Sequence, residues 1–213
     1  IIGMRALSFS AQAAGEENEQ MTKKEIAMTI LFALVLASIL FIVIPTGAAH
    51  LAAAYTDDPI VFNLIEGGIR LMVFLLYIWG ISFMGGIRRV FQYHGAEHKT
   101  IHCYEAGEAL TVENVQKFPR LHPRCGTNFL LIVMLVSIFV FAFLGWPSLV
   151  ARILSRVALL PVVAGISYEV IRFAGRSENP VVQTAIKPGL WLQYLTTRPP
   201  EDEMVEVAIE SLK

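Results

Sequence analysis

Four long segments of the chain consist almost entirely of apolar residues and dominate its pattern of hydrophobic and polar positions. A helix of about 20 residues is roughly 30 Å long, which matches the hydrocarbon core of a bilayer. A buried core helix is the alternative for any one segment, but four in one chain favour membrane spans. We therefore predict transmembrane helices at residues 26–45, 71–87, 129–146 and 157–173.

The composition supports a membrane protein. The chain has 213 residues, of which 55% are hydrophobic and only 16% are charged, whereas soluble domains carry about 25% charged residues. Mean hydropathy is +0.57. The net charge of -1 gives no basic excess for nucleic acid. We predict an all-α, polytopic membrane protein that forms a single membrane domain over residues 1–213, with the lipid bilayer as its partner.

The first apolar segment is interpreted as a retained span and not as a cleavable signal peptide. It is too long for the apolar part of a signal, and no clear small-residue cleavage site follows it. Because the chain begins with Ile1 and not with Met, we also expect residues to precede it.

The basic residues that flank the apolar segments predict an orientation, because such residues accumulate on the cytoplasmic side. With both termini in the cytoplasm, most flanking Lys and Arg residues fall on that side: Lys23, Lys24, Arg88, Arg89, Lys117, Arg120, Arg124, Arg172 and Arg176. Arg152 and Arg156 are exceptions on the outer side. They lie four residues apart on one helix face, where we expect them to line an interface or to bind lipid phosphate. Arg70, near the start of the second span, is a further exception.

Two polar stretches lie outside the predicted spans, and this topology places both in the cytoplasm. The first is residues 88–128, and the second is the tail, residues 177–213. Trp191 and Tyr194 in the tail are amphipathic rings that favour the headgroup level. Apolar residues at helical spacing predict an amphipathic helix over 203–213. We therefore predict an interfacial and amphipathic tail.

The strongest functional signal is the clustering of histidine and cysteine in residues 88–128. This segment holds six of the seven such residues of the chain: His94, His98, His102, Cys103, His122 and Cys125. His94, His98 and His102 are four residues apart, so a helix presents them on one face. Two imidazoles one turn apart can share a zinc ion. The segment His94–His98 also has the His-x-x-Glu-His form of an inverted zinc-protease motif.

We therefore predict a zinc site in the cytoplasmic segment 88–128. His94 and His98 are the first ligands, and His122, Cys125 or the more distant Glu169 supplies a third. Glu97, beside His98, is the predicted catalytic carboxylate. Further polar candidates at or near the site are His102 and Glu105. A closed site, with His94, His98, His122 and Cys125 as its four ligands, would be structural, whereas three protein ligands and an open position would be catalytic.

Some of these residues have competing interpretations. The histidines could instead contact headgroups or cap helices in a polar loop. Cys125 could be a nucleophile with His122, although their spacing in the chain is a poor guide to that geometry. A disulfide with Cys103 is disfavoured on the reducing cytoplasmic side. Glu169 could face water near Arg172, ligate the metal, or pair with Arg70.

Several blocks together resemble the YqhQ-like bacterial membrane proteins, a family of unknown function. These blocks are Phe91-Gln-Tyr-His-Gly-Ala-Glu-His-Lys-Thr100, Leu110-Thr-Val-Glu-Asn-Val115, Leu121-His-Pro-Arg-Cys-Gly-Thr127, Leu160-Pro-Val-Val-Ala-Gly-Ile-Ser-Tyr-Glu169 and Pro188-Gly-Leu-Trp-Leu-Gln193. The resemblance covers about residues 3 to 210. It implies a multi-pass protein of the bacterial inner (cytoplasmic) membrane, for which metal-dependent enzyme activity is only a suggestion. It also implies a Gly- and Gln-rich block upstream of the point where this chain starts.

Three functional hypotheses follow. The first is a metal-dependent hydrolase that acts at the cytoplasmic membrane interface on a peptide or lipid-linked substrate. The second is a membrane scaffold or assembly protein in which the metal is structural. The third is a transport component, in which Arg70, Arg152, Arg156 and Glu169 line a polar path and a homo-oligomer completes the pore.

Overall fold

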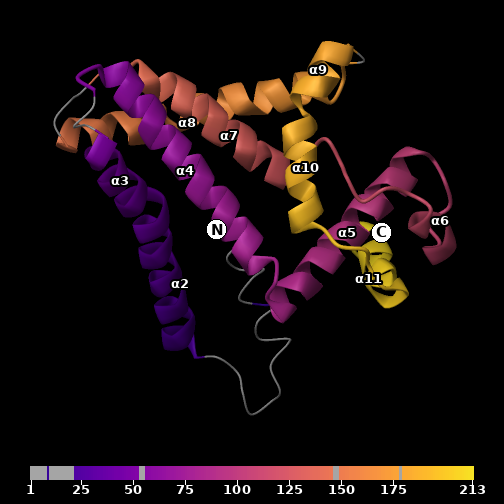
Figure 1. Cartoon of the computed structure of the whole chain (residues 1–213). Helices are drawn as coiled ribbons and strands as arrows, with labels where there is room; N and C mark the ends of the chain where they lie inside the picture. Colours follow the sequence, from indigo (N-terminus) through magenta and orange to yellow (C-terminus); the bar gives the residue numbers. More distant parts are fainter. Residues whose placement is uncertain (1–8, 10–21, 53–55, 146–148, 178) are drawn as a thin grey trace.

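The computed structural model describes residues 9, 22–52, 56–145, 149–177 and 179–213. Each regular element within these ranges is helical (Figure 1). Three described segments are long and apolar enough to cross a membrane: Lys24–Ala49, Pro59–Ile81 and Leu154–Ala174. The all-helical prediction is therefore confirmed for the described residues, with three candidate spans in place of the predicted four.

The first membrane-length segment is a helical rod made of three consecutive elements. These are α2 (Lys23–Ser38), the π-helical turn η1 (Ile39–Val43) and α3 (Ile44–Ala52). Thr22 begins the rod with a capping box, in which its hydroxyl accepts from the Glu25 amide and the Glu25 carboxylate accepts from the Thr22 amide. The rod includes the whole predicted segment 26–45.

The second membrane-length helix, α4 (Pro59–Ile81), has different bounds from the prediction. Asp58 caps it and Pro59 occupies its first turn, where a missing amide hydrogen costs nothing. The predicted segment 71–87 starts too late and runs across the link between two helices, because α4 ends at Ile81 and α5 (Gly85–Glu105) begins four residues later. An unpaired charge is costly inside a span. In the structure, Arg70 is paired with Glu66 one turn earlier.

The other two predicted spans correspond to α7 (Gly126–Ala142) and α8 (Leu149–Ala174). α8 is one helix that continues through Pro161. α7 is apolar but has only 17 residues, which is the lower end of the length that crosses a bilayer. It packs against α4, α8 and α10 (Lys187–Thr196). Residues 146–148, which include the end of the predicted segment 129–146, lie outside the described residues.

The two polar stretches pack against each other. Figure 1 shows α5 extending away from the long helices, with α6 (Val112–Gln116) and α11 (Asp202–Leu212) beside it. Gly107, at a φ of 72°, ends α5 in a left-handed turn that glycine adopts without a steric penalty. The short helix α9 (Pro180–Ala185) leads from α8 into α10.

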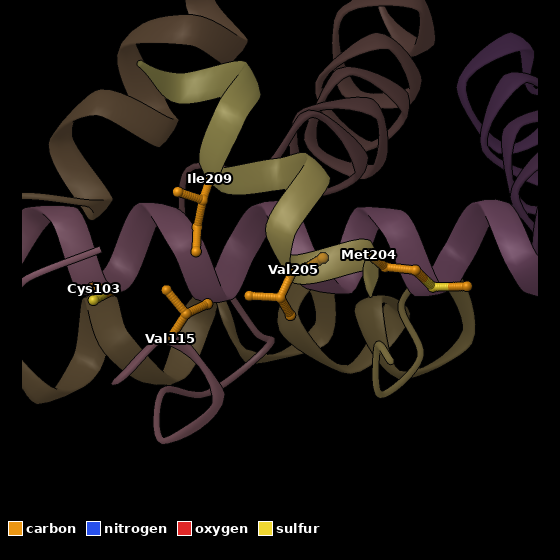
Figure 2. Close-up of a cluster of buried hydrophobic side chains, with 6 residues drawn as sticks. Cys103, Val115, Met204, Val205 and Ile209 are labelled. Carbon is orange, nitrogen blue, oxygen red and sulfur yellow. The ribbon is translucent and has the colours of Figure 1, made fainter. Parts of the chain in front are cut away.

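A small hydrophobic core joins α5, α6 and α11 (Figure 2). Its buried members are Ala96, Cys103, Val115, Met204, Val205 and Ile209. The amphipathic helix predicted at 203–213 is therefore present as α11, and protein covers its apolar face. The reason is that α5 carries small apolar residues on the face away from its histidines, so it offers α11 a complementary surface.

The segment after α10 crosses directly over α5. The Arg198 amide donates to the Phe91 carbonyl at 2.8 Å, and Gln92 donates to the Pro199 carbonyl at 3.3 Å. The approach is so close that a Cβ atom on Gly95 would overlap the Arg198 carbonyl oxygen. Gly95 is therefore the residue that permits the tail to lie against α5.

We expect Gly95→Ala to destabilise the docking of the tail on α5 by roughly 1–3 kcal/mol, because the clash is with backbone and not with a flexible side chain. Gly86→Ala is the matched control in the same helix, since a Cβ atom there meets nothing within 4 Å. It should leave stability unchanged or slightly raised. Thermal unfolding of the two variants in detergent, followed by circular dichroism, measures the difference. Equal unfolding temperatures for the two variants would contradict the close approach of Arg198 to Gly95.

Candidate metal centre

The histidines at four-residue spacing do lie along one face of α5. The ring centroids of His94 and His98 are 4.4 Å apart. A fourth imidazole, His122, lies opposite them, 5.8 Å from the His98 ring and 4.6 Å from the His102 ring. The helix and the facing segment together form a continuous row of imidazoles.

The facing segment, residues 117–125, has no regular structure and is held by hydrogen bonds. The buried Gln193 side chain of α10 accepts from the His122 amide at 2.8 Å and donates to the His122 carbonyl at 2.7 Å. The segment ends at Cys125, which caps α7 and accepts from the Thr127 amide at 3.3 Å. α10 and α7 thus position the segment from both sides.

Backbone carbonyls fix the tautomers of His94 and His98. Nδ1 of His94 lies 2.8 Å from the Thr196 carbonyl oxygen, and Nδ1 of His98 lies 2.6 Å from that of Arg120. A carbonyl oxygen only accepts, so each Nδ1 carries a hydrogen, and in the neutral ring each Nε2 keeps its lone pair. This is the arrangement by which metal-ligating histidines are usually oriented.

The two Nε2 atoms and one sulfur form the first candidate metal group. Sγ of Cys125 lies 3.3 Å from Nε2 of His94, and the donor atoms of His94, His98 and Cys125 all lie within 4.8 Å of one another. Tetrahedral zinc with a nitrogen at about 2.0 Å and a sulfur at about 2.3 Å holds these two atoms about 3.5 Å apart. The separation of nitrogen and sulfur therefore fits a zinc ion.

The electrostatics of Cys125 favour the thiolate that a metal requires. Burial acts to raise the pKa of this thiol, but hydrogen bonds from His94, His98 and Thr127 outweigh burial and lower the pKa to about 5. The pKa of His94 is raised, chiefly by its hydrogen bond to Cys125 and against the effect of burial. Both directions correspond to a thiolate beside a protonated His94, whose Nε2–H donates to the sulfur. A bound metal ion would take the place of that proton.

The second group, His102, Glu105 and His122, has donor atoms equally close together but a different hydrogen-bonding pattern. Nδ1 of His122 accepts from the Arg124 amide at 3.2 Å, so the neutral ring carries its hydrogen on Nε2, which faces Glu105 at 3.5 Å. Glu105 also pairs with the Arg124 side chain. Because His122 has no lone pair left for a cation, this group fits a hydrogen-bonded network better than a metal site.

Two carboxylates and one imidazole of this region differ in their surroundings. The pKa of His122 is lowered, first by burial and then by the neighbouring His102. Burial opposes ionisation of Glu105, yet the charge of Arg124 and the hydrogen bond from His122 lower its pKa. Glu97 is exposed. His122 therefore stays neutral, and Glu105 stays charged, near neutral pH.

A pocket of about 330 Å³ opens beside the first group. Glu97, Ile101, Glu105 and Arg124 line it together with the cysteine and three of the histidines. The predicted catalytic residue therefore borders the same space as the predicted ligands His94, His98 and Cys125. His102 is not among the residues that line it, and its Nε2 lies 2.9 Å from the Leu121 carbonyl oxygen.

The remaining predicted residues lie elsewhere. Glu169 is exposed on α8 and pairs with Arg172 at 3.3 Å, so it is not a member of either group. Arg70 and Arg156 both pair with Glu66, at 2.7 Å and 3.0 Å. The side chain of Arg152 lies outside the described residues.

Sequence reasoning missed three residues of this arrangement. Glu66 could have been found from its position one turn before Arg70, which is the spacing of a helical ion pair. Gln193 and Thr196 gave no comparable signal, because only tertiary packing brings their polar groups to residues 94 and 122. Both cysteines are free, so the disfavoured disulfide does not form.

The fold and the site define an all-helical protein with helices of membrane-spanning length and a buried histidine–cysteine cluster beside them. The family model described as "Protein of unknown function (DUF1385)" matches residues 1–213, and the chain belongs to this family. It is 40% identical over 224 residues to the "Uncharacterized protein YqhQ" of Bacillus subtilis (strain 168), a match that covers 98% of this chain and 70% of that protein. The family resemblance is thus confirmed. No solved structure matches the chain.

We expect Cys125 to react with iodoacetamide as a thiolate in metal-stripped protein until the pH falls through about 5. Cys103, whose pKa is raised by burial, should stay unreactive at neutral pH. His94→Ala should move the Cys125 midpoint upward because the main stabilising hydrogen bond is lost, whereas His102→Ala should not. Mass spectrometry of the peptides that contain Cys103 and Cys125 measures the rate of alkylation of each cysteine across the pH range. If Cys125 of the wild-type protein titrates near the ordinary thiol pKa, its contact with His94 is contradicted.

Proposed function

We propose that this protein is a metal-dependent hydrolase of the bacterial cytoplasmic membrane, with a zinc ion held by His94, His98 and Cys125. The observation that carries the proposal is the convergence of Nε2 of His94, Nε2 of His98 and Sγ of Cys125, with both Nδ1 atoms held by backbone carbonyls. Backbone carbonyls already orient both imidazoles, so little ordering is required on metal binding. Imidazole and thiolate are the donors that zinc prefers.

The number of donors supports a catalytic site over a closed structural site. Among the described residues the first group contains three donors, and tetrahedral zinc has four positions. His122, the predicted fourth ligand of a closed site, is engaged by Arg124 and Glu105 instead. The pocket of about 330 Å³ lies beside the donors. A zinc ion held by these three residues would supply Lewis acidity beside the pocket.

Glu97 is our candidate for the general base. It borders the pocket from the same helix as His94 and His98, and its exposed carboxylate can accept a proton from an incoming water molecule. Arg124 and Glu105 border the same space. A peptide or lipid-linked substrate would reach this pocket from the membrane interface.

The proposed setting is a multi-pass protein with four spans and both termini in the cytoplasm. The span added to the three membrane-length segments is α7, whose 17 residues extend about 25 Å. Trp191 and Tyr194 on α10 are 62% and 50% exposed, which suits amphipathic rings at the headgroup level. The positions of basic residues in the sequence support the same orientation.

The scaffold and transport hypotheses receive less support. A scaffold needs no open position or bordering carboxylate. In the transport hypothesis Arg156 and Glu169 line the same path. They are 13 residues apart on α8, which is about 20 Å along the helix. Glu169 pairs with Arg172 on an exposed surface.

A second candidate is a cysteine nucleophile activated by His94. Cys125 lies at a helix N-terminus with a pKa lowered to about 5, and the Thr196 carbonyl orients the imidazole beside it. This is the logic of a nucleophile–base–orienter triad. The partner is His94 and not His122, the residue considered from sequence. Chelator-insensitive activity that iodoacetamide abolishes would favour this candidate.

We expect purified protein to bind roughly one zinc ion per chain with an affinity typical of protein zinc sites. His98→Ala and Cys125→Ala should each lose most of this metal, because a ligand is removed. His102→Ala is the matched control, since it removes an imidazole of the same helix that is not a member of the first group. Elemental analysis of protein in detergent measures the content. Full metal content in His98→Ala would overturn the assignment.

Glu97→Gln should keep the metal and lower hydrolysis by about 100-fold or more, because amide nitrogen and oxygen cannot take up the proton. Glu113→Gln, an exposed carboxylate on α6, is the control. The assay incubates protein with casein or with a bacterial lipid extract and detects released products by mass spectrometry. Equal rates for both variants would exclude Glu97 as the base.

A further inference from the structure

A buried group of charges lies between the long helices, away from the candidate metal centre. The Glu66 side chain is 1% exposed, and Arg156 donates to both of its oxygens, each at 3.0 Å. Arg70 donates to the same carboxylate at 2.7 Å and to the Phe41 carbonyl, in the π-helical turn η1, at 3.1 Å. Thr46 adds a hydrogen bond at 3.2 Å. Three elements, α3, α4 and α8, therefore meet at this carboxylate, and Arg70 links η1 to it.

The charge balance of this group is positive. One carboxylate, that of Glu66, pairs with two arginines, Arg70 and Arg156. Charge in an apolar environment is costly unless it is balanced and hydrogen-bonded. An excess of arginine over carboxylate here favours an anion.

A cavity of about 660 Å³ adjoins the group, and it exposes the arginines and not the carboxylate. Arg70 and Arg156 line it and keep 18% and 20% of their side-chain surface accessible, whereas Glu66 does not line it. The other lining residues are mainly apolar, among them Val133, Leu160 and Val163. The cavity thus combines guanidinium groups with a long apolar wall.

This combination matches one class of ligand. The planar fork of arginine suits two oxygens of a phosphate, and an apolar wall suits an acyl chain, since burying each CH₂ contributes about 0.8 kcal/mol. A phosphate without a chain would leave the apolar wall unfilled. A zwitterionic lipid would bring its own cation to a region that is already positive.

We propose that this cavity binds an anionic phospholipid, with the phosphate on Arg70 and Arg156 and an acyl chain along the apolar wall. The site rests on the proposed membrane location but not on the metal. Phe141 of α7 contacts Arg156 and lies about 24 Å along that helix from Cys125. Loss of lipid binding and loss of metal binding can therefore be measured separately.

The test uses the full chain in detergent, titrated with dioleoyl phosphatidylglycerol or dioleoyl phosphatidylcholine and followed by native mass spectrometry. Phosphatidylglycerol should bind at least about tenfold more tightly. Arg156→Gln should remove most of this preference, whereas Arg172→Gln, an exposed arginine of the same helix, should retain it. Glu66→Gln should strengthen binding, because the carboxylate no longer competes for the arginines.

A fall in affinity with Glu66→Gln as large as that with Arg156→Gln would overturn the proposal, because the pair would then only hold the fold together. Displacement of the lipid by inorganic phosphate at similar concentration would also overturn it. If Arg156→Gln does not fold, Gly47→Leu replaces it. Gly47 lines the cavity and a Cβ atom there meets nothing within 4 Å, so the new side chain should block the lipid. Unchanged lipid binding in that variant would contradict the site.

Discussion

Two backbone carbonyl groups, those of Arg120 and Thr196, determine what the histidines of α5 can do. Each accepts from an Nδ1–H, so His98 and His94 present Nε2 toward Cys125. The carbonyls come from segments 22 and 102 residues away in the chain. With the other tautomer, each Nε2 would carry hydrogen and the same side chains could not hold a cation. The chemistry of the site therefore depends on main-chain atoms that are not part of its motif.

Those carbonyls are in place only when the tail is folded. Gln193 holds the segment that carries Arg120 by two hydrogen bonds to His122, and the chain beyond α10 lies against α5 at Gly95. The core of α5, α6 and α11 secures the end of the tail (Figure 2). The cluster is thus a property of two polar stretches folded together, and not of the segment 88–128 alone.

The long helices and the cluster meet different physical demands. The cluster places thiolate and imidazole where backbone amides and carbonyls can satisfy them, at the start of α7. The long helices bury one carboxylate, and Glu66 is acceptable there because two arginines and a hydroxyl saturate its oxygens. An ion pair one turn apart lowers the cost of charge in a span, which is why α4 extends twelve residues before the predicted start at residue 71.

The sequence by itself determined what depends on local spacing. Apolar segments of about 20 residues predicted the long helices, and the four-residue interval placed His94, His98 and His102 on one face of α5. Apolar residues at helical spacing predicted α11. Only the tertiary structure decided that Cys125 joins His94 and His98, that His122 turns to Glu105, and that Glu169 stays on an exposed face with Arg172. Helix geometry fixes which residues of one element share a face. The partner of each polar atom depends on how elements distant in the chain pack together, and spacing carries no information about that.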